Sequence, residues 1–203
     1  MHSREKRTKE KLHIVYIPGL GDRMPWLVWL QEIALRAWVS PSVKCSVFTF
    51  GWSGNDKFDN RLDALNQHIK TKVKNGHEVV LVGSSAGASA ALAAYAQHPE
   101  KVRAVVLICG KIHDVPAIPE PLLDYNNVFE EALELLPKKL EKLSDDKRDH
   151  ILSMRTKADP IVPKEDTLIR GAHHFAMPMV GHIVGIAYAL ITQRSRVLRF
   201  ARR

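Results

Sequence analysis

The chain has 203 residues, of which 45% are hydrophobic and 26% are charged, with neither a low-complexity tract nor an internal repeat. This length and composition are typical of one folded domain with a sizeable core, and they exclude a disordered or fibrous chain. The formal charge of +8 lies in the ends, because residues 1–12 carry five Lys or Arg against two Glu and residues 194–203 carry five Arg and no acid.

We therefore expect basic tails at residues 1–11 and 194–203 around a folded domain at 12–193. Solvated tails are the favoured interpretation, since the body has no basic groove with interleaved aromatic residues. Contact of the tails with nucleic acid or an anionic membrane is the less favoured alternative. The N-terminus lacks the apolar region of a signal peptide and no apolar stretch approaches the ~20 residues of a membrane span, which predicts a cytoplasmic protein.

Short apolar runs that alternate with helical patterns predict the fold. Strands are expected at residues 12–17, 45–50, 78–83, 102–109 and 150–154, with a weaker sixth at 173–178. The runs at 78–83 and 102–109 are almost wholly apolar, which favours strands covered on both faces. The pattern predicts an α/β protein with a doubly wound, mostly parallel sheet of about six strands, helices on both faces and ligands at the carboxyl ends of the strands.

Two amphipathic crossover helices are predicted at residues 25–38 and 58–73. Their apolar positions are expected in the core: Trp26, Trp29, Leu30, Ile33 and Ala37 in the first, and Leu62, Leu65, Ile69 and Val73 in the second. Residues 111–149 are expected to form a small helical insertion over the sheet edge, either a lid or a plain packing pair. Pro137 should kink its helix or start a second one.

The stretch VVLVGSSAG at residues 79–87 matches the pattern GxSxG with Gly83, Ser85 and Gly87. A predicted strand precedes it and an alanine-rich helix follows, which is the context of a nucleophile elbow. Glycine is needed two residues to either side of the serine because a Cβ there would clash. This spacing predicts that Ser85, not Ser84, is the nucleophile, beside a helix N-terminus that favours developing negative charge.

A serine nucleophile needs a base and an orienting carboxylate, which follow in the order Ser, Asp or Glu, His. Asp159 follows the fifth strand in MRTKADPIVP, and His182 begins the last helical pattern after the sixth. A simple turn at Asp159-Pro160 is the alternative interpretation. His173 and His174 are expected to be partly exposed strand residues.

With these motifs the chain resembles a compact, esterase-like or lipase-like serine hydrolase of the α/β-hydrolase superfamily, from about residue 12 to 192. The resemblance rests on IPGLGD (17–22), GSSAG (83–87), TKADPIVP (156–163) and VGHI (180–183). It implies Ser85 as nucleophile, His182 as base and acid, and Asp159 as the carboxylate that holds the imidazole. It also implies an oxyanion hole formed by the backbone N–H groups of Leu20 and Ala86.

Three positions depart from the family pattern. Pro18-Gly19 stands where many members have His-Gly, Ser84 where a His commonly precedes the nucleophile, and Thr156 where a glycine often lies three residues before the acid. The alternative acid is Asp114, just after the fourth strand. The resemblance further implies the family's sheet without its first two strands.

The function implied is hydrolysis of a small carboxylic ester through an acyl-enzyme on Ser85. Thioester or amide hydrolysis would use the same groups, and a non-catalytic binding protein of hydrolase fold is the alternative of another class. Trp52 and Ser84 are expected to border the pocket, although Trp52 could equally be a packed loop anchor. No cofactor or metal is expected, because the ten His do not cluster at ligand spacing. Cys45 and Cys109 are expected to be buried, reduced thiols.

Overall fold

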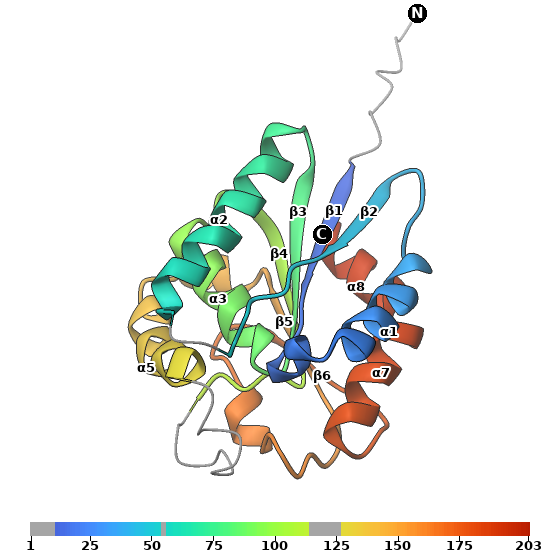
Figure 1. The fold of residues 1–203 in the computed structure, drawn as a ribbon, viewed down its shortest axis with the longest axis vertical. Coiled ribbons are helices and arrows are strands. Elements are labelled where there is room, and N and C mark those ends of the chain that lie inside the picture. The colour runs from blue at the N-terminus through green and yellow to red at the C-terminus, as the bar shows by residue number, and fades with distance from the viewer. Residues whose placement is uncertain (1–10, 54–55, 114–126) are drawn as a thin grey trace, which may run out of the picture.

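The computed structural model describes residues 11–53, 56–113 and 127–203. Their strands form one six-stranded parallel sheet in the order β2-β1-β3-β4-β5-β6 (Figure 1). The strands are β1 (Leu12–Ile17), β2 (Val43–Val47), β3 (Glu78–Ser84), β4 (Val102–Ile108), β5 (Ile151–Arg155) and β6 (His173–Ala176). The doubly wound parallel sheet is thereby confirmed.

Helices cover both faces of the sheet (Figure 1). One face carries α2 (Phe58–Lys74), α3 (Gly87–Gln97) and α5 (Asn127–Leu140), and the other carries α1 (Pro25–Arg36), α7 (His182–Thr192) and α8 (Arg194–Ala201). Short turns of helix occur at η1 (Leu20–Arg23), α6 (Asp145–Arg148) and η2 (Lys164–Thr167). No helix in these described ranges is long and apolar enough to cross a membrane.

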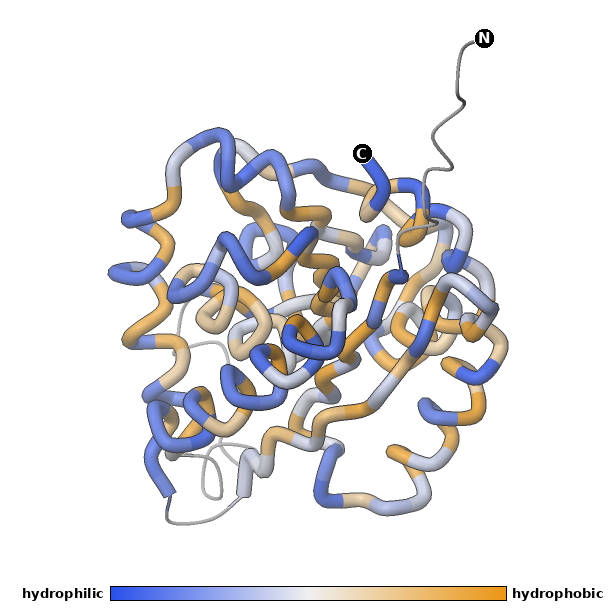
Figure 2. Tube along the Cα trace, turned by 90° about the horizontal axis from the view of Figure 1, so that it is seen from above, coloured by the Kyte–Doolittle hydropathy of each residue, from blue (hydrophilic) through white to orange (hydrophobic). Residues whose placement is uncertain are grey.

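The two-residue period of the strands creates two hydrophobic cores. In β1, Val15 and Ile17 pack under α2 and α3, while Ile14 and Tyr16 pack on the opposite face. The other central strands divide their apolar side chains in the same way, so both sides of each strand are buried. In the hydropathy-coloured trace the strands run through the centre in mostly apolar colours (Figure 2).

The expected burial of the α1 stripe is wrong. Trp26 and Trp29 are 60% and 56% exposed, and Leu30, Ile33 and Ala37 are exposed with them. The reason is that α1 is apolar on more than one side, and a different side, which includes Leu35, packs on the protein. In α2 the predicted positions Leu62, Leu65 and Ile69 are buried, and only Val73 near its end is exposed.

The basic segment at 194–203 is not a solvated tail, because residues 194–201 form α8. Its buried residues are Val197, Leu198, Phe200 and Ala201. They pack into the core under α1 and α7 while arginines project outward, and Arg103 donates a hydrogen bond to the carbonyl of Ala201 at 3.0 Å. The many arginines of this segment led to the prediction of a solvated tail, although its apolar residues follow the spacing of an amphipathic helix. Residues 1–10 of the expected N-terminal tail lie outside the described residues.

In the predicted insertion at residues 111–149, the described helix α5 packs on a face of the sheet rather than over its edge, and residues 114–126 lie outside the described residues. Phe129, Leu133 and Leu136 of α5 are buried in the core shared with α2 and α3. The helix continues through Pro137 to Leu140, so no second helix begins at that proline. The carboxylate of Glu131 also accepts the N–H of Phe58 at 2.7 Å, which ties α5 to the start of α2.

Candidate active site

Ser85 lies in the sharp turn between β3 and α3. Its φ of +52° is in the left-handed region, which is costly for any residue with a side chain. Two hydrogen bonds hold this conformation: Ser85 N–H donates to the carbonyl of Ile108 at 3.0 Å, and Ser85 carbonyl accepts the N–H of Lys111 at 3.3 Å. The end of β4 therefore supports a strained, half-exposed serine at the carboxyl edge of the sheet, where all six strands end.

The flanking glycines allow this turn by close backbone contacts. A Cβ on Gly83 would lie 2.3 Å from the carbonyl oxygen of Gly87, and a Cβ on Gly87 would lie 2.0 Å from that of Ile17. Both distances are far inside van der Waals contact, so no side chain fits at either position. The tight approach of α3 to β1 and β3 thus depends on glycine at both places.

The loop after β1 runs directly beside the serine. A Cβ on Gly19 would lie 2.7 Å from the Cβ of Ser85 and 3.2 Å from the backbone nitrogen of Ala86. The neighbouring N–H groups of Leu20 and Ala86 donate to no protein acceptor within the described part of the chain. Two unpaired N–H donors therefore belong to residues at the serine turn, as an oxyanion site requires.

Two residues fix this loop to the segment after β2. The carboxylate of Asp22 accepts the N–H of Gly51 at 2.6 Å, and burial raises the pKa of Asp22 in spite of this bond. The indole of Trp52 is fully buried and donates to the carbonyl of Pro18 at 3.1 Å. Trp52 is therefore the packed loop anchor, not a residue that borders an open pocket. Sequence patterns did not single out Asp22, although it lies in the IPGLGD motif.

Ser84 does not border the site either. It is buried, and its hydroxyl lies 2.7 Å from the hydroxyl of Tyr16 in the core under α1 and α7. Alternation along β3 turns the Ser84 side chain into this core on the other face of the sheet. The expectation that Ser84 is a neighbour on the pocket side is therefore wrong, and its role is to pair a buried tyrosine hydroxyl.

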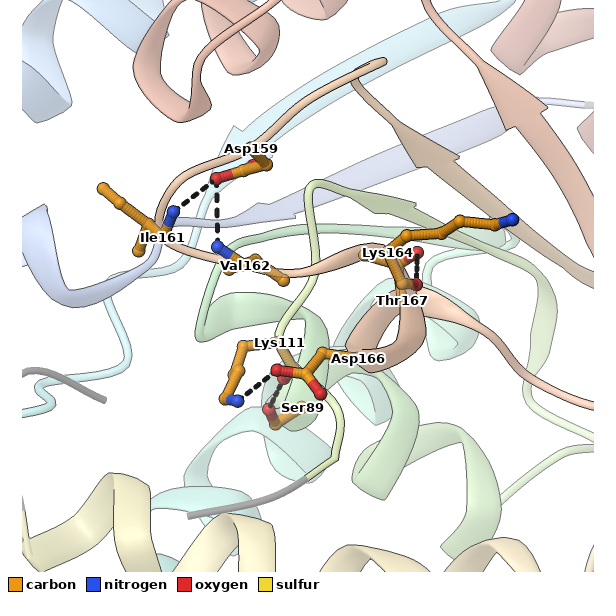
Figure 3. A network of polar contacts seen from close by, with 8 residues as sticks. All are labelled: Ser89, Lys111, Asp159, Ile161, Val162, Lys164, Asp166 and Thr167. Atoms are coloured by element: carbon orange, nitrogen blue, oxygen red, sulfur yellow. Dashed lines mark hydrogen bonds and ion pairs between the residues drawn. The ribbon is translucent and has the colours of Figure 1, made fainter. Parts of the chain in front are cut away.

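Asp159 and His182 form a buried pair at the same edge of the sheet. The Nδ1 atom of His182 lies 2.8 Å from Asp159, and the two side chains are 5% and 7% exposed. The carboxylate also accepts the N–H groups of Ile161 and Val162 at 2.9 and 3.0 Å (Figure 3). Burial raises the pKa of Asp159, but the hydrogen bonds from His182 and the two N–H groups outweigh it and leave the pKa below its ordinary value. Asp159 is therefore ionised at neutral pH.

Parallel pairing beyond β5 and β6 brings these two residues together. Ala158 forms a parallel bridge with Val180, Lys157 donates to the carbonyl of Met179, and Gly181 donates to that of Ala158, both at 2.8 Å. Gly181 then turns the chain with a φ of +94° into the start of α7 at His182. The register of two neighbouring strands thus sets the distance between acid and base.

The pair is adjacent to Cys109, which directly follows β4 and has a φ of +50°. Burial, followed by the charge of Asp159, raises the pKa of the Cys109 thiol to about 12. Cys109, Asp159 and His182 form the one group close enough to share a metal ion among the residues that the structure describes. A protonated thiol and an imidazole nitrogen already paired with a carboxylate make this a poor metal site. Cys45, in contrast, is only half-buried.

The other predicted site residues are Ser85, the alternative acid Asp114, and the strand histidines His173 and His174. Ser85 is on the same sheet edge as the Asp159–His182 pair, and no hydrogen bond within the described ranges joins its hydroxyl to His182. Such hydrogen bonds are often long in free enzymes and become shorter when substrate binds.

Asp114, the alternative acid, lies outside the described residues. His173 is near Asp149 (2.9 Å) and His174 is near the carbonyl of Ile169 (3.0 Å), as expected of strand residues.

One buried ion pair behind the serine was missed from the sequence. The ammonium group of Lys111 pairs with the carboxylate of Asp166 in η2 (Figure 3). Ser89 of α3 donates to the Lys111 carbonyl at 2.6 Å, so the pair joins the nucleophile helix, the loop after β4 and the loop after Asp159. No motif marks either residue, because the pairing depends on the folded positions of two distant loops.

A doubly wound parallel sheet, a strained serine at the β3–α3 turn and an acid–histidine pair two strands away are the features of an α/β hydrolase. Residues 47–148, half of the chain, match the family described as the alpha/beta hydrolase fold, and the protein belongs to this family. No match is found among curated proteins.

Solved structures support the same fold at low sequence identity. A peroxisomal alpha-beta-hydrolase from Saccharomyces cerevisiae has a TM-score of 0.67 at 15% identity, over 100% of this chain and 78% of that one. An esterase domain from a Rhodothermus marinus protein has a TM-score of 0.65 at 16% identity, over 97% and 90%. A thioesterase domain from the curacin biosynthetic pathway has a TM-score of 0.62 at 12% identity, over 95% and 92%.

Proposed function

We propose that this protein is a serine hydrolase that cleaves carboxylic esters through an acyl-enzyme on Ser85. The observation that carries the proposal is a buried Asp159–His182 pair at the same carboxyl edge of the sheet as a strained serine turn. Structural packing alone does not require a serine with positive φ and an ion-pairing histidine at one edge of the sheet. The esterase and lipase character of several fold neighbours favours the same class of reaction.

The hydrogen-bond pattern suggests how the serine is activated. An ionised carboxylate can only accept hydrogen bonds, so Nδ1 of His182 carries the proton that points to Asp159. The Nε2 atom is then left as the base that takes the proton of the Ser85 hydroxyl. Asp159 also stabilises the imidazolium that forms, because its own position is fixed by the N–H groups of Ile161 and Val162.

The proposed reaction has two halves. Ser85 Oγ attacks the ester carbonyl carbon, and the N–H groups of Leu20 and Ala86 bind the oxyanion of the tetrahedral intermediate. The intermediate collapses to an acyl-serine, and His182 gives its proton to the departing alcohol. Water then attacks the acyl-serine with His182 as base, which releases the carboxylic acid and restores the serine. The substrate is a small molecule, and no cofactor takes part.

A fluorophosphonate probe tests the nucleophile. We expect one covalent adduct by intact mass, located at Ser85 by peptide mapping, and no adduct on Ser85→Ala. Ser84→Ala is the matched control, since it removes the adjacent hydroxyl and should leave labelling in place. A wild type that is not labelled, or a Ser85→Ala variant that is labelled equally, would favour the binding-protein alternative.

Thioester hydrolysis is the second candidate, because a thioesterase domain is among the fold neighbours. The bond cleaved is decided by comparing kcat/KM for p-nitrophenyl esters of increasing acyl length with that for acyl thioesters of the same acyl groups. Higher values for the esters at each length would support the main proposal. Higher values for the thioesters would replace it with thioester hydrolysis on the same serine.

A further inference from the structure

The outward side of α1 is an apolar stripe that no other part of residues 11–53, 56–113 or 127–203 covers. Trp26, Trp29, Leu30 and Ile33 follow the spacing i, i+3, i+4, i+7 and are all exposed. A row of large apolar side chains along one side of a helix is normally packed against another element. Four large apolar side chains exposed at this spacing are therefore a candidate docking surface.

Helix α7 packs beside α1 and also carries exposed apolar side chains (Figure 1). Ile183, Val184 and Ile191 of α7 are exposed, as is Val180 just before it. We name this surface the α1–α7 face, and it comprises Trp26, Trp29, Leu30, Ile33, Val180, Ile183, Val184 and Ile191. Exposed apolar residues that gather in this way mark interaction sites, whereas single ones do not.

The α1–α7 face lies close to the candidate active site. Helix α1 follows β1 by way of η1, and α7 follows β6, so both helices begin at the carboxyl edge of the sheet. Ile183 directly follows His182. A surface that covers the α1–α7 face therefore lies next to the Asp159–His182 pair.

The charges around the face indicate what covers it. Residues 23–40 and 177–203, which contain α1, α7 and α8, carry seven Arg, one Glu and no Lys or Asp, which is most of the +8 of the chain. Six of these arginines are exposed: Arg23, Arg36, Arg196, Arg199, Arg202 and Arg203. The seventh, Arg194, donates to the carbonyl of Trp38, so α8 adjoins the end of α1. A second copy would bring two strongly positive faces together, whereas an anionic surface complements them.

We propose that the α1–α7 face docks onto an anionic lipid bilayer. Trp26 and Trp29 enter the headgroup region, where the amphipathic indole ring is favoured. The exposed arginines of α8 and Arg36 bind the lipid phosphates, since each basic side chain near an anionic bilayer strengthens binding. The docking does not depend on the proposed ester hydrolysis, and its readouts below use binding alone.

Tryptophan fluorescence offers a selective readout. The chain has four Trp, and Trp38 and Trp52 are already 1% and 0% exposed. A blue shift upon addition of phosphatidylglycerol vesicles can therefore come only from the two tryptophans of the face. We expect this shift with vesicles that contain phosphatidylglycerol, a much smaller one with pure phosphatidylcholine, and a loss of the shift as salt is raised.

Vesicle flotation separates the apolar and charged contributions. We expect Trp26→Gln/Trp29→Gln to weaken binding at least tenfold, since both rings would lose burial in the bilayer. Arg36→Gln/Arg199→Gln should weaken it by about twentyfold or more, at roughly fivefold for each arginine. The matched controls lie on the opposite face of the sheet: Val73→Gln for the apolar change and Lys74→Gln/Lys138→Gln for the charge. All these side chains are exposed, so circular dichroism should show an unchanged fold.

Three results would overturn the proposal. The first is equal binding of the face variants and the control variants. The second is equal binding to neutral and anionic vesicles. The third is a wild-type dimer by light scattering that Trp26→Gln/Trp29→Gln converts to a monomer, with no vesicle binding, which would assign the face to a second copy.

Discussion

A methyl group added at Gly19 is expected to displace the oxyanion loop from the serine turn. In Gly19→Ala the new Cβ would lie 2.7 Å from the Cβ of Ser85 and 3.1 Å from the carbonyl oxygen of Ser84. Carbon atoms normally approach to about 3.5–4.0 Å, so the loop or the turn must move by about 1 Å. A misplacement of this size costs about 10²-fold in rate, and loss of one oxyanion donor costs about 10²–10³-fold.

The expected result is therefore a fall of about 10²–10³ in kcat for a p-nitrophenyl ester, with a smaller change in KM. Unfolding in urea should show a loss of about 1–3 kcal/mol, as for other overpacked positions. Gly21→Ala is the matched control, since its Cβ would meet the ends of flexible side chains, the Cδ2 of Leu27 at 2.5 Å and the Cε of Met24 at 3.3 Å, and no backbone atom within 3.8 Å. If Gly19→Ala keeps the kcat of Gly21→Ala, the loop after β1 does not supply an oxyanion donor.

Three further predictions test the site and its support. Asp159→Asn should lower kcat about 10⁴-fold with the fold intact, because an amide no longer holds the required imidazole tautomer. A decrease in kcat of less than about tenfold would show that Asp159 is not the acid that orients His182. Lys111→Met should destabilise the protein by about 3–5 kcal/mol in urea by leaving the Asp166 carboxylate buried and unpaired, and adding Asp166→Leu should recover most of it; a neutral single variant would contradict the buried pair. Burial, with the positive charges around it, lowers the pKa of His13 from 6.5 to about 4. Between these values the unfolded chain binds a proton that the folded chain does not, so stability should fall as the pH drops from 6.5 towards 4, on the order of 2 kcal/mol in total. His13→Gln should flatten this dependence, and an unchanged slope would refute it.

The parts of the fold and site that the sequence predicted are those with a local physical cause. The strands are visible as apolar runs because both faces of a parallel sheet are buried. The serine turn is visible because Gly83 and Gly87 meet backbone atoms within a few residues or on the adjacent strand, which leaves a fixed spacing in the sequence. Asp159 and His182 could be selected because each lies in the loop or helix start that follows a strand, Asp159 after β5 and His182 after β6.

The parts that were wrong or missed depend on which neighbour a side chain meets. Ser84 and Trp52 lie beside the expected site in the sequence, yet their partners are Tyr16 and the carbonyl of Pro18. The pairing of Lys111 with Asp166 likewise joins loops 55 residues apart. No local pattern contains such information, because the partner is chosen by the positions of whole strands and loops.

Helix α1 shows where hydrophobic periodicity itself reaches its limit. A moment identifies the core side of a helix only if the opposite side is polar. In α1 the stripe of Trp26 and Trp29 and the side with Leu35 are both apolar, so the sequence contains two candidate core sides and the fold uses the second. The side with Trp26 and Trp29 exposes large apolar side chains to water, which is unfavourable. In the docking that we propose, this apolar side and the arginines of α8 bind an anionic lipid surface. The side of α1 that was wrongly predicted to lie in the core is then the side that binds the membrane.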